Sequence, residues 1–261
     1  MIRKKIAYLL LATASLTAAA AAQAQTLDEL VAKNLEALGG KDKVEAVKSV
    51  RMTGKMNLPQ GMEAAIVLEQ QNPKRMRMDM TLQGMTMVQA YDGKAGWKIV
   101  PFTGKTDPEP MSAEEIKQME KQAVNSADFL STLKDEGYTA ELAGKEDVEG
   151  TPTYKIKVTS KDGDVLNLFL DAEQYLLVKV KGKSLMQGQE IETDTTVGDY
   201  KEVGGILFPF SIQTKIAAFP TPLTMSFEKI EVNPDIPDSR FAMPAKADKP
   251  ADKPATTPPQ G

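Results

Sequence analysis

The residues that could do chemistry in this chain are acids, lysines and hydroxyls, because its 261 residues include no histidine and no cysteine. This composition excludes Ser-His-Asp and Cys-His nucleophiles, thiolate and imidazole metal sites, haem and iron–sulfur ligation, and disulfides. An enzyme built from the remaining side chains would have to use carboxylates. We expect neither a cofactor nor a bound metal.

Two groups of carboxylates have regular spacing. Glu63, Glu69 and Asp79 take alternating positions along strand-like segments, and Asp162 and Asp164 flank a turn glycine. Neither group has the spacing of a calcium loop or a neighbour that would separate two pKa values. We interpret them as solvated strand faces and turn formers and expect that the protein is not an enzyme. A two-carboxylate hydrolase is the alternative that this spacing disfavours.

Methionine is concentrated in one stretch: eight of the 13 methionines after residue 24 lie between positions 52 and 87. Thioethers pack adaptably, so a methionine-rich face suits an apolar ligand of variable shape, but methionine also fills gaps in an ordinary core. Alternation along strands places the following residues on shared faces, where we predict a ligand cavity: Met52, Met56, Met76, Met78, Met80, Met85 and Met87.

Other apolar residues are predicted to complete this cavity. Both faces of the segment 165–170 are mainly apolar, so both require cover. A helix expected at 113–134 offers an apolar side. A tryptophan that follows the turn at Asp92 and Gly93 is interpreted as a core residue, although its position would also let it line the cavity mouth. The further predicted ligand-binding residues are Trp97, Ile116, Met119, Leu130, Leu166 and Leu168.

The elements that must position these residues are mostly short strands. From residue 49 onward, apolar and polar residues alternate between turn residues, a pattern typical of antiparallel hairpins. Two meanders are predicted, with the stretch 102–110 breaking the sheet between them. The expected strands are 50–56, 62–70, 75–82, 85–91 and 95–100, then 138–146, 153–160, 165–170, 175–181, 190–201, 206–216 and 223–232.

Three helical segments are also predicted. Thr26 with Glu29, and Ser112 with Glu115, have the spacing of capping boxes, so helices should begin beside them. The first should end at Gly39, with a short turn of helix over 41–47. From Ser112, apolar residues continue at helical spacing to about residue 134, where Asn125 and Ser126 could form a kink or break. This helix, 113–134, is a candidate lid.

Both ends of the chain are expected to lie outside the folded domain. Residues 1–24 combine a basic start, an apolar stretch and small residues before Gln25, which predicts a cleavable signal peptide and a periplasmic protein. Residues 25–243 should form one mainly β domain. Residues 244–261 repeat Lys, Asp, Ala and Pro, a composition typical of a disordered tail.

Charge argues against one class of partner. Removal of residues 1–24 leaves 29 Lys and Arg residues (32 − 3) against 36 Asp and Glu residues, a net charge of −7. Such a balance disfavours nucleic acid or an anionic membrane surface as the main partner. We expect a monomer that binds no nucleic acid.

Several short motifs follow one another in a distinctive order along the chain. They are Leu38-Gly39-Gly40, Met52-Thr53-Gly54-Lys55-Met56, Asn72-Pro73-Lys74-Arg75, Tyr91-Asp92-Gly93-Lys94-Ala95-Gly96-Trp97, Val203-Gly204-Gly205-Ile206-Leu207-Phe208-Pro209, and Val232-Asn233 leading to Phe241 and Pro244. The two most specific parts are an Asp-Gly-x-x-x-Trp segment and a Gly-Gly-x-x-x-Pro segment. In this order the motifs resemble the outer-membrane lipoprotein-sorting family with the LolA-like fold, and the resemblance covers the chain after residue 24 except the tail.

The resemblance implies a single curved antiparallel sheet that forms a half-open barrel, with helices covering its concave face. It also implies a carrier that shields acyl chains of a lipoprotein or lipid during transfer toward the outer membrane, between a membrane-bound donor and acceptor. The alternative is a sensor module of the same fold that binds envelope lipid or peptide without transporting it. The family's best-known carrier has an arginine that latches its lid before the proline at position 73, where this chain has Asn72.

Overall fold

The structure is a computed structural model that describes residues 25–122, 129–133, 135–186, 189–217 and 220–244. The helices in this part of the chain are α1 (Leu27–Leu38), α2 (Lys41–Glu45), α3 (Ala113–Gln122), α4 (Phe129–Thr132) and the short 3-10 helices η1 (Pro59–Gly61), η2 (Pro101–Thr103) and η3 (Asp238–Arg240). The strands are β1 (Ser49–Asn57), β2 (Glu63–Gln71), β3 (Arg75–Leu82), β4 (Met85–Tyr91), β5 (Gly96–Val100), β6 (Lys105–Pro110), β7 (Thr139–Val148), β8 (Thr151–Thr159), β9 (Val165–Asp171), β10 (Leu177–Met186), β11 (Gln189–Val203), β12 (Ile206–Ile216) and β13 (Leu223–Val232).

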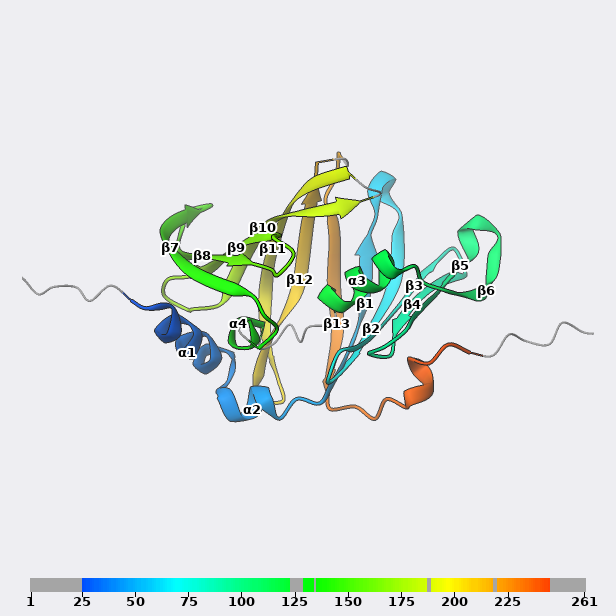
Figure 1. The fold of residues 1–261 in the computed structure, drawn as a ribbon, viewed down its shortest axis with the longest axis horizontal. Helices are drawn as coiled ribbons and strands as arrows, with labels where there is room; N and C mark the ends of the chain where they lie inside the picture. The colour runs from blue at the N-terminus through cyan, green and yellow to red at the C-terminus, as the bar shows by residue number, and fades with distance from the viewer. Residues whose placement is uncertain (1–24, 123–128, 134, 187–188, 218–219, 245–261) are drawn as a thin grey trace, which may run out of the picture.

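All thirteen strands form one sheet in the order β6-β5-β4-β3-β2-β1-β13-β12-β11-β10-β9-β8-β7. Neighbouring strands are antiparallel, and the pairing of β1 with β13 joins the two meanders. The sheet is curved and open, with β6 and β7 as its edges (Figure 1). The predicted fold class, a half-open barrel with helices on its concave face, is confirmed.

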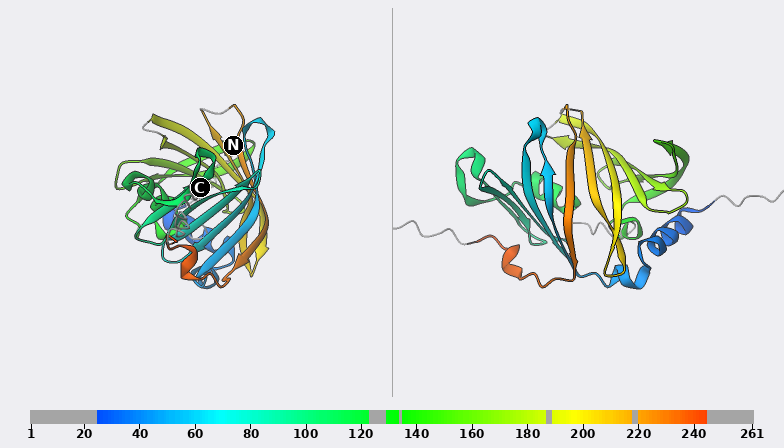
Figure 2. Two further views of the ribbon diagram at one scale, coloured as in Figure 1. Left: turned by 90° about the vertical axis from the view of Figure 1, so that its right-hand side faces the viewer. Right: turned by 180° about the vertical axis from the view of Figure 1, so that it is seen from behind.

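The helices α1, α3 and α4 lie on one side of this sheet (Figure 1). The connection from β6 to β7 contains α3 and α4 and crosses the concave side, where α1 also packs (Figure 1). In the view from behind, α3 lies beyond the strands (right panel of Figure 2). The space between helices and sheet is therefore the place where an apolar site could form.

Two glycines allow close approaches that shape this space. At Gly54, where the register of β1 and β13 shifts, a Cβ atom would lie 2.1 Å from the carbonyl oxygen of Ser226. At Gly39, which has a φ of +129°, a Cβ atom would lie 2.2 Å from the carbonyl oxygen of Gly205. No side chain fits either position, so β1 can bulge against β13 and α1 can end against the β11–β12 turn.

Both predicted capping boxes are confirmed. The Thr26 hydroxyl accepts a hydrogen bond from the Glu29 amide at 3.2 Å, and the Glu29 carboxylate accepts one from the Thr26 amide at 2.9 Å. Ser112 and Glu115 exchange the corresponding bonds at 3.3 and 2.9 Å. These local signals fix where α1 and α3 begin, because each satisfies backbone donors that lack an intrahelical partner.

One prediction about the region between the meanders is wrong. The stretch 102–110, expected to break the sheet, contains part of η2 and the edge strand β6. An edge strand tolerates Pro108 and Pro110 because its outward side lacks a hydrogen-bonding neighbour. The described parts of the expected helix 113–134 are α3 and the short α4; residues 123–128, which include the expected kink or break, and residue 134 lie outside the described residues.

The predicted signal peptide and most of the predicted tail, residues 1–24 and 245–261, also lie outside the described residues. The predicted boundaries of the domain therefore stay predictions. Within the part of the chain that the structure describes, no helix combines the length and apolar character that crossing a membrane requires.

Two large apolar clusters fill most of the concave side. One joins α1 and α2 to the central strands and contains Leu38, Val44, Ile66, Phe208 and Phe227. The other joins α1 and α4 to β8 and β9 through Leu30, Leu130, Ile156, Leu168 and Leu170. Since each residue contributes about 1.5–3 kcal/mol when fully buried, these clusters hold the helices on the sheet.

Candidate ligand-binding pocket

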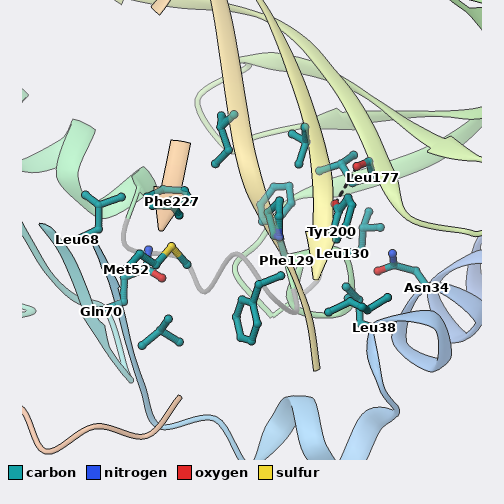
Figure 3. Close-up of a pocket in the computed structure, with 16 residues that line it drawn as sticks. Asn34, Leu38, Met52, Leu68, Gln70, Phe129, Leu130, Leu177, Tyr200 and Phe227 are labelled. Carbon is teal, nitrogen blue, oxygen red and sulfur yellow. Dashed lines mark hydrogen bonds between the residues drawn. The ribbon is translucent and has the colours of Figure 1, made fainter. Parts of the chain in front are cut away.

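An enclosed apolar pocket lies between the two large clusters. Its volume is ≈ 220 Å³, and α1, β1, β2, α4 and β10 to β13 contribute its walls (Figure 3). Thirteen of its sixteen lining residues are apolar, and none of the sixteen carries a charge. The lining residues are Asn34, Leu38, Val50, Met52, Leu68, Gln70, Phe129, Leu130, Leu177, Val197, Tyr200, Leu207, Phe208, Pro209, Ile212 and Phe227.

The alternation of side chains along the strands and the register between strands determine which residues form the pocket wall on the sheet. Val50 pairs with Gln70 and Met52 with Leu68, so all four side chains share the concave face of β1 and β2. Phe227 extends this wall because it pairs with Gly54, two residues after Met52. The pocket wall is thus built where the two meanders join.

Helices α1 and α4 close the opposite side. Leu130 is buried between the pocket and strands β8 and β9, and Phe129 lies beside it in the lining. Asn34 of α1 is buried, and its side-chain amide donates to the carbonyl oxygen of Tyr175 at 2.7 Å. The helix is therefore fixed by a specific hydrogen bond as well as by apolar packing.

Three lining side chains are polar, and two of them have backbone partners. Besides Asn34, the Tyr200 hydroxyl donates to the carbonyl oxygen of Leu177 at 2.8 Å. Burial raises the pKa of the Tyr200 phenol well above its usual value of 10, so this side chain is neutral at physiological pH. The third polar residue is Gln70, whose Oε1 atom is buried without a hydrogen-bond partner among the described residues.

Only two residues of the predicted site line this pocket, Met52 and Leu130. Leu166 and Leu168 pack in the neighbouring cluster under α1 and α4. Met56 and Met80 pack against the central cluster at its margin. These four residues support the pocket from outside its lining.

The remaining methionines follow a different pattern. Met76 and Met119 are buried with Tyr91 and Met111, and Ile116 packs against them, so this end of the concave face is filled by α3. Met85 is 41% exposed at the start of β4. Met78 and Met87 are half-buried on the same face of the sheet as Met76. The predicted methionine face exists, but the pocket lies beside it.

The structure places Trp97 in a buried cluster on the convex face, as the core interpretation predicts, and not at the cavity mouth. It is 3% exposed, and its indole Nε1 donates to the carbonyl oxygen of Phe241 at 2.7 Å. Alternation along β5 points Trp97 away from the face that carries Lys98, the partner of Glu115 on α3. The C-terminal segment, residues 234–243, covers it from outside.

Four of the five carboxylates that sequence analysis singled out lie in ion pairs, and the fifth, Asp164, is hydrogen-bonded with Ser160. Glu69 and Asp79 on the convex face both pair with Arg240 of the C-terminal segment, at 2.8 and 2.9 Å. Glu63 pairs with Lys55 at 3.0 Å, and Asp162 pairs with Lys117 of α3, also at 3.0 Å. Over the described residues, no group of three or more acids could hold a metal ion. Their arrangement supports structural roles.

A second cavity of ≈ 570 Å³ is larger but much more polar. Its lining includes Lys181, Lys183, Glu192, Asp194 and Lys215, and it is more open than the apolar pocket. Charged side chains of both signs stay solvated there, so this cavity does not suit an apolar ligand. The smaller apolar pocket is the better candidate site.

Sequence reasoning missed most of the lining, including Asn34, Gln70, Leu177, Val197 and Tyr200. The apolar side of α1 was visible, and with it Leu38, but no periodicity tells which part of a concave face stays hollow. The position of the pocket follows from where α1 and α4 rest on the sheet. Only long-range packing decides that.

The family's latch position has a different role in this chain. The Asn72 side-chain amide donates to the carbonyl oxygen of Val47 at 2.7 Å, and its backbone N–H donates to the carbonyl oxygen of Lys48 at 2.8 Å. Asn72 thus holds the connection between α2 and β1. The neighbouring Lys74 pairs with Glu136, which follows α4, at 2.6 Å.

Comparison with known proteins gives similar folds at low sequence identity. No curated protein matches the chain. A DUF1329 family protein from Desulfovibrio piger has a TM-score of 0.59 at 11% identity over 84% of this chain and 98% of that chain. A LolA superfamily protein from Nitrosomonas europaea has a TM-score of 0.55 at 13% identity, with the same coverage of both chains, 84% and 98%.

A third solved structure, a domain assigned to outer-membrane lipoprotein sorting from Vibrio parahaemolyticus, has a TM-score of 0.56 at 11% identity over 83% of this chain and 95% of that chain. A protein-family model with the description "Uncharacterized protein" matches residues 69–245. This match spans more than half of the chain. The chain therefore belongs to the family of that model, and its fold is the LolA-like fold.

Proposed function

We propose that this protein is a periplasmic carrier that shields the acyl chains of a lipoprotein or lipid during transfer toward the outer membrane. The observation that carries the proposal is the uncharged, mainly apolar pocket enclosed between the concave face and helices α1 and α4. An enclosed site of this kind suits hydrocarbon and offers no set of groups for catalysis. We further propose that the protein is not an enzyme.

The energetics favour a protein cavity for such a ligand. Each methylene removed from water contributes about 0.8 kcal/mol, so a long acyl chain gains on the order of 10 kcal/mol when it is buried. A chain of that kind cannot cross an aqueous compartment unprotected. A carrier must supply this free energy on loading and give it up on delivery.

The size of the pocket indicates how loading and release could work. Its volume of ≈ 220 Å³ lies below the roughly 300–1,000 Å³ of typical ligand sites, so a long acyl chain requires the pocket to enlarge. Phe129 and Leu130 of α4 occupy the side opposite the sheet. These side chains compete with the ligand for the same space, and their return would favour release.

The comparisons support this proposal through the fold. Similar structures include a LolA superfamily protein and a domain assigned to outer-membrane lipoprotein sorting. The signal-peptide pattern of residues 1–24 supports a periplasmic location. An acylated lipoprotein or lipid, a membrane-bound donor and a membrane-bound acceptor are the proposed partners, and the carrier would act as a monomer.

The direct test is to purify the protein from its native compartment and analyse extracted lipid by mass spectrometry. We expect a stoichiometric acyl ligand, and displacement of the neutral dye Nile red by acyl compounds in the purified protein. Absence of both would refute the proposal. Depletion in cells then separates transport from sensing, because loss of a carrier misplaces lipoproteins whereas loss of a sensor changes only a stress response.

A further inference from the structure

The apolar pocket contains one polar atom whose bonding the protein leaves incomplete. The side chains of Asn34 and Tyr200 both donate to backbone carbonyl oxygens. Oε1 of Gln70, in contrast, is almost completely inaccessible to solvent and has no hydrogen-bond partner among the described residues. A buried acceptor without a partner costs about 1–3 kcal/mol. Buried polar groups are nearly always paired, so this exception calls for a partner that the described chain does not supply.

The position of Gln70 makes the ligand a suitable partner. Gln70 pairs with Val50 on the concave face of β2, and both residues line the pocket. Met52 lies diagonally across on β1 and shares this wall (Figure 3). Because Oε1 of Gln70 has almost no accessible surface, a ligand in the pocket reaches it only if neighbouring side chains move, and the flexible Met52 is one that can do so.

The lining also restricts the charge of the ligand. None of the sixteen residues that line the pocket is charged, so a carboxylate or phosphate pushed into it would lose its hydration without gaining an ion pair. An uncharged ligand avoids this cost. The unpaired acceptor adds a second requirement, because only a hydrogen-bond donor satisfies it.

We infer that the pocket selects uncharged acyl ligands that carry a hydrogen-bond donor, an amide N–H or a hydroxyl, and that Gln70 accepts this hydrogen bond. The inference rests on the proposed function and names the ligand class. A cavity of ≈ 10 Å³ beside Gln70, lined also by Ser49 and Asn72, is at the lower limit for one water molecule. A water bound there would satisfy Gln70 without a ligand, and the test separates the two cases.

The test measures displacement of Nile red by four probes that share a ten-carbon chain: decanamide, 1-decanol, methyl decanoate and decanoate. The amide and the alcohol should bind roughly three- to tenfold more tightly than the ester, which lacks a donor, since one hydrogen bond contributes about 0.5–1.5 kcal/mol. Decanoate should bind most weakly at neutral pH. The amide and alcohol arms distinguish the two sources of the donor.

Gln70→Leu tests the role of the side chain, because it keeps the approximate size and removes the acceptor. The preference for amide and alcohol over ester should vanish, with the affinity for the ester unchanged. Thermal unfolding should occur at the same or a higher temperature, since an unpaired buried polar group is removed. Gln70→Met provides a second variant without an acceptor, and Gln89→Leu, on the same face of β4 outside the pocket lining, is the matched control that should keep the preference.

Three results would overturn the inference while leaving the carrier proposal intact: equal affinity for amide, alcohol and ester in the unmodified protein, a preference that persists in Gln70→Leu and Gln70→Met, or an equal loss of affinity for all probes in both variants. If the preference for amide and alcohol over ester persists in these variants, the partner of Gln70 is a water molecule and not the ligand. Failure of every probe to displace the dye from the unmodified protein would refute the carrier proposal and this inference together.

Discussion

Two regions of the concave face differ in how completely they are filled. At the methionine end, Met119 of α3 and Met111 just before it pack onto Met76 and Tyr91, and that cluster is buried. In the middle of the face, over the junction of the two meanders, the lining of the pocket is richer in Leu, Val and Phe, yet a cavity of ≈ 220 Å³ remains. The hollow part of the molecule is therefore the part with fewer methionines.

This difference follows from the mechanics of the side chains. Methionine has three rotatable bonds and adapts to irregular gaps, so a methionine-rich region closes on itself when a helix covers it. Val197, Pro209 and Phe227 around the pocket have few accessible rotamers and cannot extend to fill the space. Stiff side chains keep a cavity open, whereas flexible ones remove it.

The largest expected effect concerns the filled end. Met119→Ala should lower the free energy of unfolding by about 2–5 kcal/mol, because it leaves a void in a buried cluster. Urea unfolding followed by circular dichroism measures this change. Met85→Ala is the control: Met85 is 41% exposed, so its loss should change stability by less than about 0.5 kcal/mol. Equal losses of unfolding free energy in the two variants would contradict the conclusion that Met119 is packed in a core whereas Met85 is not.

The second prediction concerns the C-terminal segment, which covers the convex face of the sheet behind the methionine end. Arg240→Ala should destabilise the protein by about 1.5–3 kcal/mol, because Glu69 and Asp79 lose charged hydrogen bonds. Glu69 retains Arg51 at 2.9 Å, which limits the loss. Thermal unfolding measures it, and Lys229→Ala, which removes an exposed ion pair with Glu231, is the control. A loss no greater than that of the control would contradict a structural role for Arg240.

The third prediction concerns the apolar pocket. Val197→Trp should fill the cavity and lower the affinity for Nile red more than tenfold, or about 1.4 kcal/mol. Stability should change by less than about 1 kcal/mol, because the added atoms occupy existing space. Met87→Trp places the same side chain on the methionine face outside the pocket lining and should leave dye affinity unchanged. Equal loss of affinity in both variants would show that the dye binds elsewhere.

The smallest expected effect is a pH dependence at the methionine end. Hydrogen bonds from Lys98 and Ser112 lower the pKa of Glu115 below its usual value of 4.5. Since the folded state prefers the ionised form, this stabilisation is present at neutral pH and is lost as the pH falls below about 4.5 and through the folded-state pKa. The carboxylate is 42% exposed, so solvent screening limits the effect to less than about 1 kcal/mol.

The comparison of Glu115→Gln with the unmodified protein checks this effect. Urea unfolding at pH 7 and pH 3.5 should give a smaller pH dependence in the variant. If the variant and the unmodified protein have the same pH dependence, the ion pair between Glu115 and Lys98 does not contribute to the pH dependence of the free energy of unfolding.

Local patterns predicted the strands and helix starts because their causes are local. Alternation placed Met76, Met78 and Met80 on one face, as the register of β2 and β3 confirms. The capping boxes at Thr26 and Ser112 also act within one turn of helix. The edge strand β6 was missed because proline lacks the N–H that a strand interior requires, so its two prolines predict an interruption of the sheet. Proline is tolerated at a sheet edge, and which strand forms the edge depends on the topology of the whole sheet.

The sequence by itself determined the antiparallel strands, the capped helices and a methionine-rich face of the first meander, because period, turn residues and caps depend on near neighbours; the curvature of the sheet was implied only by the family resemblance. The tertiary structure decided that the cavity lies over the meander junction, that Trp97 is buried on the convex face and that Oε1 of Gln70 has no hydrogen-bond partner within the described part of the chain. Those properties depend on how closely α1, α3, α4 and the C-terminal segment approach the sheet. A void is set by distances between elements far apart in the chain, and no local pattern records them.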